Sequence, residues 1–355
     1  MQAYAPGRVE LLGNHTDYND GVVLSAAIDR GVTMDGELSG NSILLLQSDG
    51  PQVRHDLDYR WPEPLTTNKW ANYPLGVVRM LLEEGYEVPG FSAQITSTLP
   101  TGAGLSSSAA LEVATCLLIE KLADYSLEPM ARAKLCRRAE NEFVGVNCGL
   151  LDQASSVFGE ENAAIYLDCR AESVSTVPFP TGLALLITDS GVKHQLTGGE
   201  YNERREQCFE AARILGVQAL RDATTEQLLA ADMPELTRRR ALHVTGEIER
   251  VLAGVEFLRA GDGAAFGRLM FESHESSRTN FENSTEELDV LVEIARSIPG
   301  IYGSRLTGGG FGGATVSLID PAQAEAIISA LTSQYKRRTG IDCPTYLTAL
   351  AAGAN

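Results

Sequence analysis

A glycine- and serine-rich turn between two apolar segments constrains the fold of this chain most strongly. The turn reads Leu-Pro-Thr-Gly-Ala-Gly-Leu-Ser-Ser-Ser-Ala-Ala over residues 99–110. Residues 91–99 alternate apolar and polar side chains, as a half-buried strand does. Residues 109–119 contain strong helix formers and almost no charge. The sequence therefore predicts a strand, a tight turn and a buried helix in succession.

The start of the predicted helix is suited to an anion. The first four backbone N–H groups of a helix have no partner within it, and the helix dipole favours negative charge there. Three serine hydroxyls, at 106, 107 and 108, add further hydrogen-bonding groups. A phosphate chain fits such a turn. A plain turn capped by serines fits equally well, because single glycine motifs recur by chance.

The charge balance limits the partners of the chain. It has 355 residues, with 47 acidic and 29 basic side chains, for a formal net charge of -18. Such a surface repels nucleic acid and anionic membranes, so we expect neither as a partner. A nucleotide can still be held by a local site with Mg²⁺. The length suggests two domains or one large one.

The cysteines and the N-terminus predict a cytoplasmic protein. Six cysteines occur without a C-x-x-C pair, which favours reduced thiols over a disulfide framework or a zinc site. The first residues lack the pattern of a signal peptide, and no uncharged apolar run reaches about 18 residues. We therefore expect no membrane span.

A dense polar turn lies near the N-terminus, over residues 13–21. Residues 14–18 bring together an amide, an imidazole, a hydroxyl, a carboxylate and a phenol. These groups suit a polyhydroxylated ligand. An ordinary solvated turn between two strands is the alternative.

A lone carboxylate, Asp152, follows a turn of small residues. Its glycine and apolar neighbours favour a poorly hydrated position, where a nearby cation would keep it charged and able to act as a base. The local sequence alone favours a simpler role, as the N-cap of residues 153–156.

The second half of the chain contains a run of five glycines within residues 308–313. The run matches G-x-G-x-x-G, but a strand-like segment follows it, so we exclude a dinucleotide-binding fold. The glycines instead predict close backbone approach to a ligand or another loop. The same half predicts a buried strand at 183–189, a helix over 199–215 and a capping box from Ser284 to Glu287. Two prolines within 174–180 mark a candidate domain boundary.

Taken together, these loops resemble the galactokinase-type members of the GHMP superfamily of small-molecule kinases. The sugar signature appears as Pro6-Gly7-Arg8-Val9 through Gly13-x-His15-Thr16-Asp17-Tyr18-Asn19. The phosphate loop matches residues 99–109, and the third motif matches residues 304–313. Lesser matches at 70–73, 139–146, 148–153 and 200–205 extend the resemblance over nearly the whole chain. The P-loop motif G-x-x-x-x-G-K-[ST] does not occur.

The resemblance implies an α+β fold of two domains, with the active site in the cleft between them. The N-terminal domain, over residues 1–178, would be similar to ribosomal protein S5 domain 2. The C-terminal domain, over residues 179–355, would be ferredoxin-like. The implied activity is an ATP-dependent sugar-1-kinase, with galactose as the first expected acceptor. ATP and Mg²⁺ would be required, and the sequence leaves the oligomeric state open, with a monomer compatible.

The resemblance also implies a role for each matching residue. Asp152 would take or orient the proton of the sugar 1-hydroxyl, while Arg8 would keep Asp152 ionised and offset charge on the transferred group. Mg²⁺ would be held by Ser108 and Glu140. The sugar would be bound by Asn14, His15, Asp17, Gly149 and Tyr201. ATP would be bound by Trp70, Gly102, Gly104, Leu105, Ser106, Ser107 and Ser108.

The chain departs from the family pattern at two positions in the signature. It has Glu10 where the family usually has Asn, and Asn14 where the family usually has a Glu that faces the C6 hydroxyl. Asn14 can still hydrogen-bond to galactose. Losing a charge there also removes repulsion of a C6 carboxylate, so a kinase for galacturonate or another C6-altered hexose stays open. A non-catalytic sensor of sugar and ATP is a third reading, which the intact residues 107–109 disfavour.

Overall fold

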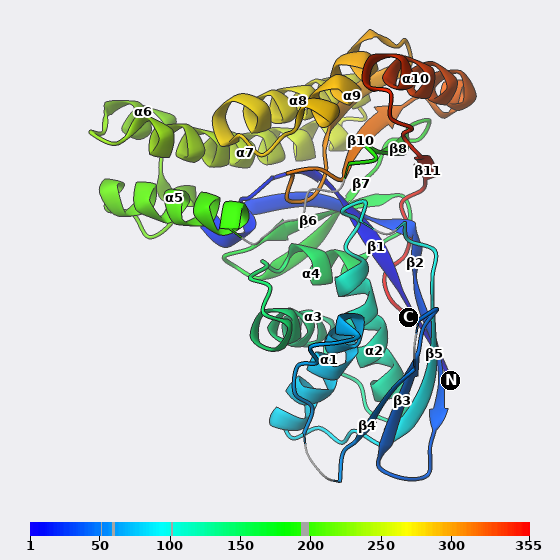
Figure 1. Cartoon of the computed structure of the whole chain (residues 1–355). Coiled ribbons are helices and arrows are strands. Elements are labelled where there is room, and N and C mark those ends of the chain that lie inside the picture. Colours follow the sequence, from blue (N-terminus) through cyan, green and yellow to red (C-terminus); the bar gives the residue numbers. More distant parts are fainter. Residues whose placement is uncertain (51, 59–60, 101, 193–198) are drawn as a thin grey trace.

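Two β-sheets organise the chain in the computed structural model, which describes residues 1–50, 52–58, 61–100, 102–192 and 199–355 (Figure 1). The first sheet has seven strands in the order β4-β3-β5-β2-β6-β7, with β1 paired to β2. The second has four strands in the order β11-β8-β10-β9. The predicted α+β fold is confirmed.

The first sheet is built almost entirely from antiparallel pairs; the pair of β3 with β5 is parallel. Its strands are β1 (Gln2–Leu12), β2 (Val22–Leu38), β3 (Ile43–Gln47), β4 (Val53–Asp56), β5 (Phe91–Ser97), β6 (Ala163–Asp168) and β7 (Ser173–Pro178). Helices α1 (Asn72–Glu83), α2 (Ser107–Leu122), α3 (Pro129–Arg138) and α4 (Leu151–Phe158) lie together beside this sheet (Figure 1). Apolar side chains of α2 and α4 pack on β1 and β2 and close one core cluster.

The predicted strand and buried helix are confirmed as β5 and α2, with residues 98–100 and 102–106 between them; residue 101 lies outside the described residues. Helix α2 is apolar all round, as a helix inside a core is. Ser106 precedes it in the left-handed region, at φ 54°, and makes no side-chain cap. The side chain of Ser106 therefore does not cap α2. Its hydroxyl donates to Asp152 instead.

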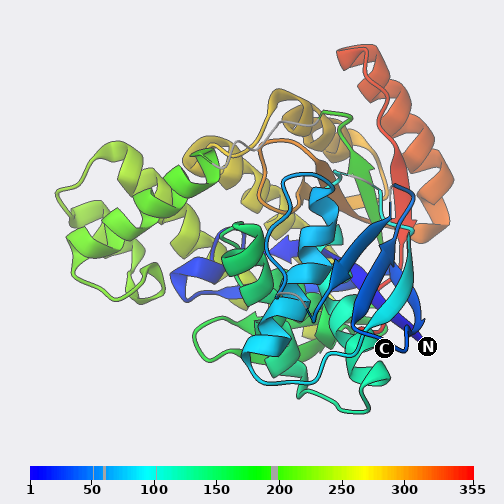
Figure 2. The same ribbon diagram turned by 60° about the horizontal axis from the view of Figure 1, so that its bottom comes forward.

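The second sheet consists of β8 (Ala184–Asp189), β9 (Ile301–Leu306), β10 (Ala314–Ile319) and β11 (Thr345–Thr348). Helices α8 (Gly263–Ser276), α9 (Glu286–Ser297) and α10 (Ala324–Thr339) belong to the same half. Helices α5 (Gly199–Leu215), α6 (Thr225–Ala230) and α7 (Glu235–Arg259) extend to one side of the molecule (Figures 1 and 2). No helix in the described residues combines the length and apolar composition needed to cross a bilayer.

Residues 174–178, where the candidate boundary begins, lie in β7, which pairs with β6 at the edge of the first sheet. One local prediction needs correction. The capping box at Ser284 and Glu287 is wrong by one residue, because Thr285 caps α9 by accepting from the backbone N–H of Leu288. The boundary at 178/179 stays a prediction.

The C-terminal segment joins the two sheets. After β11 pairs with β8, Leu350 forms a bridge with Ile28 of β2. The backbone of Asn355 then pairs with that of Tyr4 in β1. The chain ends against its own first strand, and this contact helps to fix the two sheets relative to each other.

Candidate active site

Two adjacent cavities lie where the two halves of the chain meet. One, of about 400 Å³, is lined by the polar turn of the signature, by residues 145–149 and by Tyr201 of α5. The other, of about 520 Å³, is lined by the serine turn and by the glycine run 307–313. Both cavities share Arg8, Asp152 and two glycines of the run. The predicted composite site is thus one place in the fold.

The Arg8–Asp152 pair stands at the junction of the cavities. Nε and Nη2 of Arg8 each lie 2.7 Å from Oδ1 of Asp152. The Ser106 hydroxyl donates to Oδ2 of Asp152 at 2.6 Å. Asp152 is the second residue of α4 and not its N-cap, which is Leu150. The carboxylate is therefore held at both oxygens and lines both cavities.

The two glycine-rich segments face each other across the second cavity. A Cβ added to Gly308 would lie 3.2 Å from the carbonyl oxygen of Gly104. At Gly310 the φ is +81°, and an added Cβ would lie 2.2 Å from the carbonyl oxygen of Asn283. The predicted close approach of this run to another loop is confirmed. Arg8 completes the wall, with Nη1 donating to the Gly104 carbonyl at 2.7 Å.

Two buried carboxylates, Glu112 and Glu140, lie close to Ser108 and are candidates for a metal site. Nε2 of Gln153 donates to Glu140 at 2.7 Å and to Glu112 at 3.0 Å. Burial and the charge of Asp152 raise the pKa of Glu140, although Ser108 hydrogen-bonds to it. Burial and the charge of Glu140 raise the pKa of Glu112 well above its usual range. Oε1 of Glu112 is buried without a partner among the described residues.

The oxygens of Ser108 and Glu140 suit a hard cation that takes most of its ligands from the substrate and from water. No three His, Cys, Asp or Glu residues form a metal cage within the described chain. Mg²⁺ is usually held by one or two carboxylates together with substrate phosphates and water. A hydroxyl and a carboxylate, at Ser108 and Glu140, match that donor set.

The signature loop presents His15 as a neutral ring. Burial lowers the pKa of His15 to about 4. Nε2 lies 3.1 Å from the carbonyl oxygen of Gly309, which can only accept, so Nε2 carries the proton. Nδ1 then accepts from the Tyr18 hydroxyl at 2.8 Å. The ring also contacts Tyr201, at 5.1 Å between centroids.

The position of Asp17 depends on a glycine packed directly against it. A Cβ at Gly149 would lie 1.8 Å from Oδ2 of Asp17, so a larger residue there would displace the carboxylate. Burial, with the charges of Glu10 and Asp152, raises the pKa of Asp17 to about 6. Asp17 and Gly149 thus form one wall of the first cavity.

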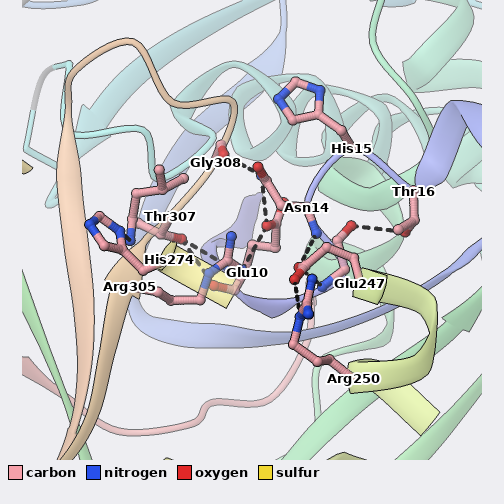
Figure 3. A network of polar contacts seen from close by, with 12 residues as sticks. Glu10, Asn14, His15, Thr16, Glu247, Arg250, His274, Arg305, Thr307 and Gly308 are labelled. Atoms are coloured by element: carbon pink, nitrogen blue, oxygen red, sulfur yellow. Dashed lines mark hydrogen bonds and ion pairs between the residues drawn. The ribbon is translucent and has the colours of Figure 1, made fainter. Parts of the chain in front are cut away.

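Two residues at the site carry interactions that the sequence reasoning missed (Figure 3). Glu247 of α7 accepts from the backbone N–H groups of Gly13 and Asn14, both at 2.9 Å. Arg305 donates to Glu10 at 2.9 Å, in a pair that is buried on both sides. The signal for Glu247 was an acidic residue beside the apolar stripe of its helix, and Arg305 lay in the third motif without a role.

The structure brings most of the predicted residues to the two cavities, whereas Trp70 and Glu140 line neither. Arg8, Asp152 and the five predicted sugar-binding residues line the first cavity. Gly102, Gly104, Leu105 and Ser106 to Ser108 line the second. Trp70 lines neither and packs against the core, while the nearby Tyr73 lines the second cavity. The role of Trp70 stays a prediction.

Comparisons with known proteins agree with this geometry. The family model of the galactokinase galactose-binding signature matches residues 1–35. Models of the GHMP kinase N-terminal and C-terminal domains match residues 72–160 and 255–337.

Curated relatives and solved structures extend the match over the whole chain. Galactokinase of Homo sapiens is 44% identical over 99% of this chain and 90% of its own length. Galactokinase of Bos taurus is 45% identical over 93% and 86%. The crystal structure of Lactococcus lactis galactokinase complexed with galactose superposes with a TM-score of 0.94, at 31% identity over 100% of this chain and 94% of that one. Mevalonate kinase of Methanococcus jannaschii, at 19% identity and a TM-score of 0.72, shares the fold. The chain therefore belongs to the galactokinase family of the GHMP kinases.

Proposed function

We propose that the chain transfers the γ-phosphoryl group of ATP to the 1-hydroxyl of galactose, giving ADP and galactose 1-phosphate. The Arg8–Asp152 pair carries this proposal, because it borders both the polar signature cavity and the cavity of the serine turn. A sugar in the first and a triphosphate in the second would meet at Asp152. Phosphoryl transfer needs this kind of positioning and charge stabilisation more than covalent catalysis.

Asp152 would orient the sugar hydroxyl and accept its proton. The hydroxyl oxygen forms a bond to the γ-phosphorus, the bond from that phosphorus to the oxygen bridging to ADP breaks, and the proton passes to Asp152. Arg8 holds the Asp152 carboxylate in place through two nitrogens and would offset negative charge as it develops on the transferred group. Ser106 fixes the second carboxylate oxygen, at 2.6 Å.

The donor end would bind through the serine turn and the start of α2. The backbone of residues 102–108 would surround the phosphates, and the adenine would lie near Trp70. Ser108 and Glu140 would hold Mg²⁺, which supplies charge neutralisation at the phosphates when bound. Glu140 lies beside Asp152 and Glu112, and a bound cation would relieve the repulsion among these carboxylates, which supports this assignment.

The acceptor end would bind through His15, Asp17, Gly149 and Tyr201, with Asn14 in the wall of the same cavity. The Asp17 carboxylate offers acceptors, as a sugar with many hydroxyls requires. The N–H of neutral His15 faces the Gly309 carbonyl, so this ring would shape the site by packing beside Tyr201. No observation favours a sensor, since the serine turn and the Arg8–Asp152 pair are both complete. All six cysteines are free, which supports a reducing cytoplasmic location.

An ADP-release assay over a panel of aldohexoses and uronic acids tests the proposal. We expect turnover with galactose, and a loss of about 10²- to 10⁴-fold in kcat for Asp152→Asn. Asp232→Asn, at an exposed position between α6 and α7, is the matched control and should keep full activity. Absence of turnover with every sugar would contradict the proposal.

A further inference from the structure

Glu10 is a buried carboxylate that borders the first cavity, and the proposed function gives it no role. It lies on β1 with 3% of its surface exposed and lines the cavity beside Asn14. Its Oε1 accepts from Nδ2 of Asn14 and from Nη1 of Arg305, both at 2.9 Å (Figure 3). None of the described residues donates a hydrogen bond to Oε2. One oxygen is therefore fixed by the protein while the other is left for a partner that is not protein.

Asn14 has no donor left for a ligand. Its Nδ2 group has two N–H donors, and these go to Glu10 and to the Gly308 carbonyl, the latter at 2.8 Å. Its Oδ1 accepts from Nδ2 of Asn283 at 2.8 Å. Only 1% of Asn14 is exposed. The Asn14 amide therefore holds Glu10, Gly308 and Asn283 in place and has no donor left for a ligand in the cavity.

The position of Glu10 along β1 indicates which end of an acceptor it meets. Arg8 and Glu10 are two residues apart in a regular stretch of β1, so their side chains lie on one face. Two strand residues span about 6.6 Å, which is comparable to the length of a hexose. If the reacting hydroxyl lies at Asp152, beside Arg8, the opposite end of the sugar lies near Glu10.

Glu10 is paired with a buried guanidinium. Burial raises the pKa of Glu10 above its ordinary value, and Arg305 and Arg8 offset part of that rise. Arg305 is fully buried, and its Nε and Nη2 have no hydrogen-bond partner among the described residues. Glu10 is the carboxylate within ion-pair distance of it, and Glu247 interacts with it electrostatically from farther away. A buried ion pair of this kind holds the carboxylate in a fixed direction.

We propose that Glu10, and not Asn14, recognises the acceptor at the end remote from its reacting hydroxyl, by accepting a hydrogen bond from a hydroxyl there. Asn14 is then a positioning residue that holds Glu10. A carboxylate accepts from a hydroxyl but repels another carboxylate, so the site takes neutral hexoses and rejects uronic acids. This inference rests on the proposed function and names the substrate class within it.

The test compares two sugars on each preparation of enzyme. The ratio of kcat/KM for galactose to that for 6-deoxygalactose does not depend on how much of the protein is folded. We expect a ratio of about 10 to 100 for the parent chain, as a hydrogen bond to a charged group gives. Glu10→Gln, which keeps the shape and loses the charge, should reduce the ratio about tenfold by slowing galactose alone.

The exchange variant sharpens the test. The double variant Glu10→Asn with Asn14→Glu exchanges the carboxylate and the amide between the two positions. It should recover most of the ratio of kcat/KM for galactose to that for 6-deoxygalactose. Equal loss on both sugars in Glu10→Gln would overturn the inference, since that is what a purely structural residue would give. Faster turnover of galacturonate than of galactose by the parent would also overturn it. Absence of galactose turnover by the parent would instead overturn the proposed function, and this inference with it.

Discussion

The acceptor end and the donor end of the candidate site are built by different means. At the acceptor end, side chains from β1, α7 and the glycine run hold one another through buried hydrogen bonds and ion pairs. At the donor end, small glycine and serine residues leave backbone groups at the start of α2 open to the cavity. The first arrangement suits a ligand that differs from its competitors by the direction of single hydroxyls. The second suits phosphates, which present similar oxygens on every side.

This difference predicts how each end responds to substitution. Specificity for the acceptor depends on side chains that are themselves held by partners far away in sequence. Affinity for the donor depends on backbone conformation, and it should tolerate changes of exposed side chains. Arg8 is the exception, because it contacts Asp152 on one side and the Gly104 carbonyl on the other.

Replacing Arg8 should have the largest effect, because it belongs to both ends. Arg8→Lys keeps the charge but cannot bind Asp152 through two nitrogens and Gly104 through a third. We expect kcat to fall by about 10²- to 10³-fold, as for loss of a preorganised donor. Steady-state kinetics with both substrates measures it. A change confined to the KM of one substrate would show that Arg8 serves one end only.

The acceptor end should respond to pH through Asp17. Burial and nearby carboxylates raise the pKa of Asp17 to about 6, so the carboxylate that we propose to bind sugar hydroxyls is protonated as the pH falls through 6. We expect the KM for galactose to rise about tenfold per pH unit below that value, with the KM for ATP nearly constant. An equal rise in both would contradict the division into two ends.

Asp17→Asn provides the control. We expect it to weaken binding of the sugar but to stabilise the folded chain. Because folding raises the pKa of Asp17, the folded chain holds more protons than the unfolded chain between pH 3.8 and about 6, and this group contributes less stability as the pH rises. The amide removes that cost. The variant should lose the pH dependence of the KM and gain on the order of 1 kcal/mol in unfolding free energy at pH 8, measured by urea denaturation.

The donor end should be sensitive to its backbone. Gly104 has a φ of +70°, in which an alanine costs about 1–2 kcal/mol. Gly104→Ala should raise the KM for ATP about five- to tenfold and leave the KM for galactose unchanged. Ser107→Ala, at an exposed side chain of the same turn, should change either KM less than twofold. A larger effect of the serine change than of the glycine change would mean that side chains hold the phosphates.

The sequence predicted the donor end better than the acceptor end, for a physical reason. The strand, the turn and the start of α2 follow one another in the chain, so local patterns were sufficient. The acceptor end is held by Glu247 on the backbone of Asn14, 233 residues away, and by Arg305 on Glu10, 295 residues away. No local pattern pairs such residues. The same limit gave position 14 a direct role that its hydrogen bonds do not support.

The measurement that tests the account most directly is a side-by-side kcat/KM for galactose, galacturonate, glucose and N-acetylgalactosamine, with the phosphorylated carbon of each product identified by ³¹P NMR. The account predicts the highest value for galactose, phosphate on C1, and no turnover of galacturonate above background. Preferred phosphorylation of galacturonate, or phosphate on a carbon other than C1, would contradict it.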